Sequence, residues 1–135
     1  MNLELTAREF EILVEAAVER IPRAFRRKMK NLVVLVQWQG REPGLLGLYE
    51  GRPLTERSSS DPPAMPDIIT IYQAPHERMA HDELHLRKIV EDTVWHEVAH
   101  YFGMNEAEVQ RAEKRHIRDR SAAQDRRMPR PERPR

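Results

Sequence analysis

The chain opens with a segment whose apolar positions follow a helical period. Spacings of three and four residues separate Phe10, Leu13, Val14, Ala17, Val18 and Ile21, as one face of an α-helix requires. Thr6 and Glu9 precede this face at the spacing of a capping box, which begins a helix. Pro22 cannot continue the helix, because its ring removes a backbone donor. The pattern predicts a helix that ends near residue 21.

Two apolar segments that follow have the pattern of β-strands. Residues 32–36 are a run of Leu and Val, which predicts a buried strand that extends through Trp38. Two glycines within residues 40–44 indicate a turn. Residues 45–50 predict a second strand, in which Gly47 is a possible bulge.

The second half of the chain begins with a loop and ends in helices. Residues 51–66 hold four prolines and three consecutive serines, which indicates a loop. Residues 67–73 predict a third strand, and residues 82–102 carry apolar side chains at helical spacing. Gly103 suits the left-handed residue that ends a helix, and a last helix is expected over 106–117. Strands flanked by helices on both sides in the sequence indicate an α+β fold.

Length and composition limit the class of protein. A chain of 135 residues, 39% hydrophobic and 33% charged, suffices for one globular domain. No apolar run reaches the roughly 18 residues of a membrane helix, and the first residues lack the features of a signal peptide. We therefore expect a cytoplasmic protein. The chain has no cysteine, so histidines and carboxylates remain as its ligands for a metal.

Charge is distributed unevenly along the chain. Residues 1–110 hold 13 Lys and Arg against 18 Asp and Glu, whereas residues 111–135 hold 10 against 4. We expect a single domain over residues 1–117 and a disordered, Arg- and Pro-rich tail over 118–135. A basic tail can contact nucleic acid or a membrane, but a solvated terminus is commoner. We therefore expect neither nucleic acid nor a membrane as a partner. The basic segment 23–30 is likewise expected to be a solvated surface.

One segment carries the chemistry. His96, Glu97, His100, Gly103 and Glu106 spell HExxHxxGxxE, a pattern whose chance expectation is on the order of 0.0002 for this composition. On a helix the two histidines project from one face about one turn apart, which suits two ligands of a tetrahedral zinc. A sharp turn at the glycine can bring the last glutamate back to the metal. The pattern predicts one Zn²⁺ per chain in a hydrolase.

The roles of the neighbouring side chains follow from the same spacing. Glu97 can take a proton from a metal-bound water and pass it to the leaving amine. Glu106 is favoured as the third ligand, and Glu108, which suits a helix-capping role better, remains the alternative. Tyr101 or Tyr72 could donate to a developing oxyanion, although this role is not favoured for either.

The motif and the order of the elements resemble a known family. HExxHxxGxxE after a helix and three strands is similar to the minimal zincin-like metallopeptidases of small bacterial proteins, and the resemblance covers residues 5–117. It implies a minimal zincin-like fold: an N-terminal helix, a short mixed sheet of three to four strands, the motif helix and a C-terminal helix. It also implies that His96, His100 and Glu106 bind zinc and that Glu97 is catalytic. The substrate would be a peptide or protein.

The chain departs from larger zinc peptidases in ways that leave alternatives open. It has no third motif histidine, no assignable methionine turn and no second lobe. An extended substrate would then pair with a sheet edge, for which residues 68–73 are the candidate. A regulatory zincin with one dedicated protein substrate is one alternative. A non-catalytic interaction module stabilised by zinc is another. The oligomeric state is not predicted.

Other residues near the motif admit functional roles, but structural roles are commoner. His76, His81 and His85 could form a second metal site, yet we expect exposed or helix-capping histidines. Trp95 and Trp38 could line a pocket, yet we expect them to pack against the core.

Overall fold

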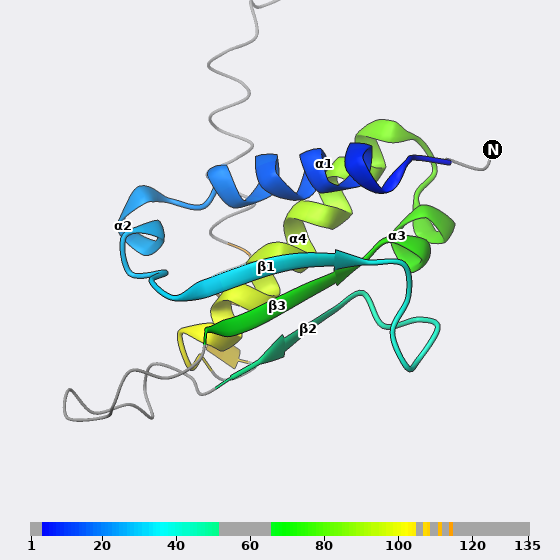
Figure 1. The fold of residues 1–135 in the computed structure, drawn as a ribbon. Coiled ribbons are helices and arrows are strands. Elements are labelled where there is room, and N and C mark those ends of the chain that lie inside the picture. The colour runs from blue at the N-terminus through cyan, green and yellow to red at the C-terminus, as the bar shows by residue number, and fades with distance from the viewer. Residues whose placement is uncertain (1–3, 52–65, 105–106, 109–110, 112–113, 115–135) are drawn as a thin grey trace, which may run out of the picture.

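The computed structural model describes residues 4–51, 66–104, 107–108, 111 and 114 (Figure 1). Their elements follow the order α1 (Ala7–Glu19), α2 (Arg23–Arg26), β1 (Leu32–Gln37), β2 (Gly47–Glu50), β3 (Asp67–Tyr72), α3 (Gln73–Met79) and α4 (Glu83–Tyr101). This arrangement confirms the predicted α+β fold with a short mixed sheet.

The first helix begins where the capping box predicts. The Thr6 hydroxyl accepts from the backbone N–H of Glu9 at 3.1 Å, and the Glu9 carboxylate accepts from that of Thr6 at 3.0 Å. The apolar face of α1 is buried through Phe10, Val14 and Ala17. The helix ends at Glu19, just before Pro22, and α2 adds the short helical turn that follows.

The sheet has β3 at its centre. Its order is β1-β3-β2, with β1 parallel and β2 antiparallel to β3. The expectation that residues 68–73 form an edge is therefore wrong, because both sides of β3 are hydrogen-bonded to neighbouring strands. The predicted bulge is also wrong, since Gly47 pairs with Ile71 in an uninterrupted register. Gly47 has another role, which is described below.

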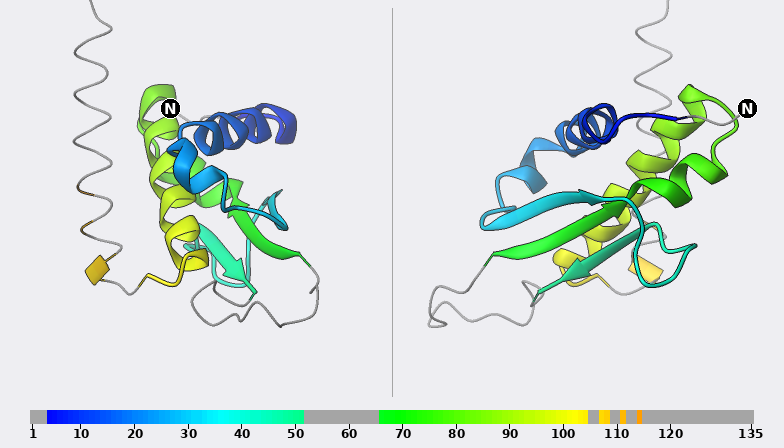
Figure 2. Two further views of the ribbon diagram at one scale, coloured as in Figure 1. Left: turned by 90° about the vertical axis from the view of Figure 1, so that its left-hand side faces the viewer. Right: turned by 45° about the vertical axis from the view of Figure 1, so that its right-hand side comes forward.

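The helices α1 and α4 cover the same face of the sheet, as the two views of Figure 2 show. The core between them includes Phe10, Ile69, Ile71, Val90 and Val94, each at most 1% exposed. The other face of the sheet is more open, so β1 alternates between half-buried and exposed residues instead of being buried throughout.

The helix α3 is not expected from the sequence. Pro75 suggests a break, but it stands third in α3, within the first turn, where a backbone donor has no partner inside the helix. The next helix, α4, begins at the cap Asp82, whose carboxylate accepts from the His85 N–H at 2.7 Å. It ends as predicted, because Gly103 has a φ of 79° directly after the C-cap Phe102.

Part of the predicted C-terminal helix is described. The backbone is helical at Ala107, Glu108, Arg111 and Lys114. The rest of that helix, residues 52–65 of the predicted loop, the domain boundary at 117 and the tail 118–135 lie outside the described residues. Among the described helices, none has the length and apolar character that crossing a membrane requires.

Candidate metal centre

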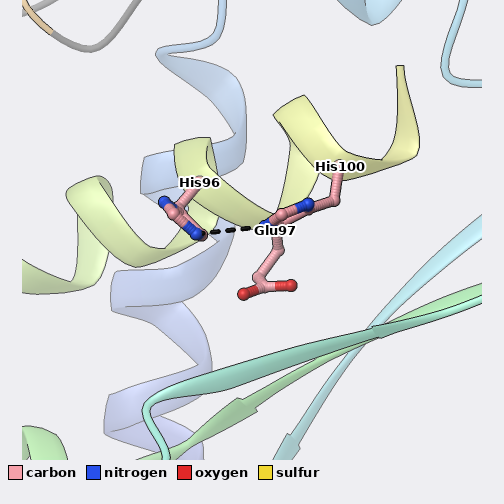
Figure 3. Close-up of side chains that lie close together, drawn as sticks. All are labelled: His96, Glu97 and His100. Carbon is pink, nitrogen blue, oxygen red and sulfur yellow. Dashed lines mark hydrogen bonds between the residues drawn. The ribbon is translucent and has the colours of Figure 1, made fainter. Parts of the chain in front are cut away.

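The motif histidines meet on the last turns of α4. His96 Nε2 and His100 Nε2 are 3.1 Å apart, with ring centroids 4.7 Å apart and ring planes inclined by 69° (Figure 3). Both side chains are half-buried. Two nitrogens on one tetrahedral zinc lie roughly 3.3 Å apart, given Zn–N distances of about 2.0–2.1 Å. The two donors are therefore spaced as ligands of one metal ion.

Glu97 completes this cluster. Its carboxylate points from α4 toward the sheet (Figure 3), and the residue is only 9% exposed. Ligand-type atoms of His96, Glu97 and His100 all lie within 4.8 Å of one another. Among the described residues, no other group of three His, Cys, Asp or Glu side chains meets this criterion. The histidine nitrogens of this cluster fit zinc.

The third predicted ligand is not tested. Glu106 lies outside the described residues, and its role stays a prediction. The alternative, Glu108, has a helical backbone and an exposed side chain. The chain turns at Gly103, directly after α4, since Gly103 N donates to the carbonyl of His100 at 2.9 Å and Met104 N to that of Ala99 at 3.1 Å.

A buried histidine supports the helix behind the cluster. His76, on α3, is 0% exposed; its Nδ1 lies 2.5 Å from the Tyr72 carbonyl and its Nε2 lies 2.9 Å from Thr93 Oγ1. Burial lowers the pKa of His76, and the contact with Tyr72 opposes this shift. The ring is therefore neutral near pH 7: Nδ1 donates to the Tyr72 carbonyl, and Nε2 lies against the hydroxyl of Thr93, which itself donates to the Ile89 carbonyl at 2.9 Å.

The prediction for His76 is wrong. An exposed or capping histidine is expected from the sequence, but α3 turns the ring into the core, where its centroid lies 5.7 Å from that of Phe10. The expectation holds for the other two. His81 N donates to His85 Nδ1 at 3.0 Å at the start of α4, with the two rings stacked. The signal for α3 in the sequence is Pro75 itself, because proline is tolerated in the first turn of a helix.

Four aromatic residues are candidates for functional roles, and three of them are buried: Trp95, Tyr101 and Tyr72. Trp95 packs edge-on against Phe25, at a centroid distance of 5.5 Å, as expected. Tyr101 is fully buried and donates to the carbonyls of residues 28 and 30 at 3.2 Å. Tyr72 is also buried, and a Cβ added at Gly40 would lie 2.8 Å from its ring. Trp38 was expected in the core but is 62% exposed.

Comparisons with known proteins agree with this geometry. No curated protein matches the chain significantly. A solved structure, a conserved hypothetical protein from Thermus thermophilus, is similar at 27% identity and a TM-score of 0.51, over 73% of this chain and 94% of that one. The family profile described as zincin-like metallopeptidase matches residues 25–116. On the strength of that match, the chain belongs to the zincin-like metallopeptidase family.

Proposed function

We propose that this protein is a zinc-dependent peptidase that hydrolyses peptide bonds with Glu97 as general base. The observation that carries the proposal is the convergence of His96 Nε2, His100 Nε2 and the Glu97 carboxylate within 4.8 Å of one another on one side of α4. Family membership supports the same activity. One Zn²⁺ per chain and a cytoplasmic site of action are part of the proposal.

Each residue has a distinct part in the reaction. His96 and His100 hold the metal, with Glu106 as the proposed third ligand, which leaves a position open for reactants. Zinc, when bound, supplies a Lewis acid that polarises the peptide carbonyl and lowers the pKa of water. Glu97 takes a proton from the attacking water and returns it to the leaving amine. The Glu97 carboxylate lies close to both histidines, and this position suits the proton transfer.

The substrate proposed is an extended peptide or an exposed protein segment. Among the described residues, β2 has a strand on one side only, and its Gly47 lies directly beside Thr93 and Glu97 of α4. An extended chain can add to such an edge through backbone hydrogen bonds. We therefore propose β2, in place of residues 68–73, as the edge strand that pairs with an extended substrate.

The two alternatives make different demands on the site. A structural zinc needs its ligands and has no use for a general base beside them, so the buried carboxylate of Glu97 favours catalysis over an interaction module. A regulatory enzyme with one dedicated substrate would use the same residues. Cleavage of many unrelated unfolded peptides would exclude that version.

The test separates metal binding from hydrolysis. Glu97→Gln keeps the side-chain volume but removes the base, so we expect hydrolysis of unfolded peptides to fall about 10²- to 10⁴-fold while one zinc per chain is retained. Glu83→Gln is the control, because Glu83 lies on the same helix in an exposed ion pair with Arg87. Elemental analysis and a peptide-cleavage assay measure the two quantities. Unchanged hydrolysis in Glu97→Gln would refute the catalytic role.

A further inference from the structure

A glycine of the sheet lies directly against the motif helix. Gly47 is the first residue of β2 and is buried against α4. A Cβ built at this position would lie 2.8 Å from Thr93 Cγ2, 3.1 Å from Glu97 Cγ and 3.4 Å from the Thr70 carbonyl oxygen. The first distance is too short for any real contact, and the second is tighter than an ordinary one. The missing side chain thus sets how near β2 lies to Glu97.

The neighbours of Gly47 have little freedom to yield. Thr93 is 7% exposed, and its hydroxyl lies 2.9 Å from both His76 Nε2 and the Ile89 carbonyl oxygen. Since α3 and α4 hold this side chain from behind, a Cβ at position 47 would act on the strand or on Glu97. The atom of Glu97 that it would meet is Cγ, the carbon that carries the carboxyl group.

We propose that Gly47 is a positioning residue for Glu97: by lacking a side chain, it lets the edge strand support the general base without displacing it. This inference rests on the proposed function, because it gives the glycine a role in the same reaction. Reacting groups displaced by about 1 Å can lose on the order of 10²-fold in rate, so a shift of a few tenths of an ångström is measurable.

The chain offers a matched control. Gly44, in the turn before β2, has nothing within 4 Å of an added Cβ. Gly44→Ala therefore makes the same chemical change with no contact to α4. We expect Gly44→Ala to keep the melting temperature, the zinc affinity, kcat and KM of the parent.

The first measurement compares Gly47→Ala with Gly44→Ala in the full chain. We expect kcat of Gly47→Ala to fall about 10-fold, with KM and zinc affinity within about threefold of the parent. The absorption spectrum of the protein loaded with Co²⁺ in place of zinc should also change, because the carboxylate beside the metal has moved. An unchanged kcat and spectrum in a folded Gly47→Ala protein would overturn the proposal.

A second variant separates positioning from packing. Thr93→Ser removes Cγ2, the nearest obstacle, but keeps the hydroxyl that meets His76. In Gly47→Ala/Thr93→Ser we expect the melting temperature to return to that of Thr93→Ser alone. The rate should stay at least about threefold below Thr93→Ser, since the new Cβ still meets Glu97 Cγ. Recovery of both stability and kcat would show that Gly47 serves packing only and would overturn the proposal.

The cobalt spectrum keeps this inference distinct from the proposed function. If the parent cleaves no peptide but binds cobalt, the peptidase proposal fails. The spectra of Gly47→Ala and of the double variant then decide the position of Glu97. A spectrum altered in both, and unaltered in Gly44→Ala and Thr93→Ser, supports the positioning role; a parental spectrum in the double variant refutes it.

Discussion

Two histidine pairs with the same sequence spacing stand at the two ends of α4, and they differ in the orientation of their rings and in what their ring nitrogens face. His81 and His85 have ring centroids 4.8 Å apart, and His96 and His100 have theirs 4.7 Å apart. The first pair stacks with planes only 10° apart, and one ring nitrogen accepts from a backbone N–H. The second pair is inclined by 69° and brings both Nε2 atoms within 3.1 Å.

The difference shows that spacing alone does not make a metal site. His81 precedes the cap Asp82 and is exposed. The Nδ1 of His85 accepts from the backbone N–H of His81, so this nitrogen makes a contact at the start of the helix. His96 and His100 both lie within the helix, half-buried, with the carboxylate of Glu97 beside them. Convergent nitrogens, and a carboxylate within 4.8 Å of both, distinguish the second pair. Each of these features can be tested by substitution.

The largest effect is expected from removing one ligand. His96→Ala should lower zinc affinity more than about 100-fold, because even outer partners of a ligand contribute 10- to 100-fold. His85→Ala, the matched change in the other pair, should leave zinc affinity unchanged. Titration with zinc, together with elemental analysis, measures both. At a zinc concentration 100 times Kd, the parent should gain about 2.7 kcal/mol of stability.

Two outcomes would break the comparison. Equal loss of zinc in His96→Ala and His85→Ala would mean that the two pairs do not differ as ligands. Full affinity in both would place the metal elsewhere. In either case the 3.1 Å between His96 Nε2 and His100 Nε2 would no longer explain zinc binding.

A smaller effect is expected at the third ligand. Glu106→Ala should lower zinc affinity about 10- to 100-fold, less than loss of a histidine, because a water oxygen can take the place of a carboxylate. Glu108→Ala is the matched control, since its side chain is exposed, and it should keep parental affinity. Isothermal titration with zinc measures both. The reverse result would make Glu108 the ligand and would shift the motif's last position by two residues.

The sequence predicted the elements whose signals are local. The capping box at Thr6, the helix stop at Gly103 and the four-residue spacing of His96 and His100 all depend on neighbours within one or two turns. Such short-range signals are legible in a single chain. The sequence therefore predicts that His96, Glu97 and His100 lie together on one helix, as their side chains do.

The errors concern contacts between distant segments. The central position of β3 depends on pairing with β1 and β2, and a run of apolar residues does not specify its partners. Gly47 looked like a bulge because its close approach to Thr93 and Glu97 spans some fifty positions. His76 looked exposed because Pro75 suggested a break, although proline is tolerated in a first turn. Tertiary packing decided all three.

The smallest effect concerns His76, which lies behind the site without joining it. Burial lowers the pKa of His76 below its ordinary value of 6.5, so the unfolded chain binds a proton more readily than the folded one. Its contribution to stability is therefore complete above about pH 6.5 and is lost as the pH falls toward the folded pKa. His76→Gln should remove this part of the pH dependence.

The measurement must be made without zinc, because protons also compete with the metal for His96 and His100. Urea unfolding of the metal-free protein between about pH 7.5 and 5.5 gives the slope of stability with pH. We expect a shallower slope in His76→Gln than in the parent. His81→Gln is the control, since it removes an exposed imidazole and should leave the parental slope. If the two variants instead change the slope equally, the burial of His76 has no bearing on its titration, and the contrast between core and surface histidines loses its energetic basis.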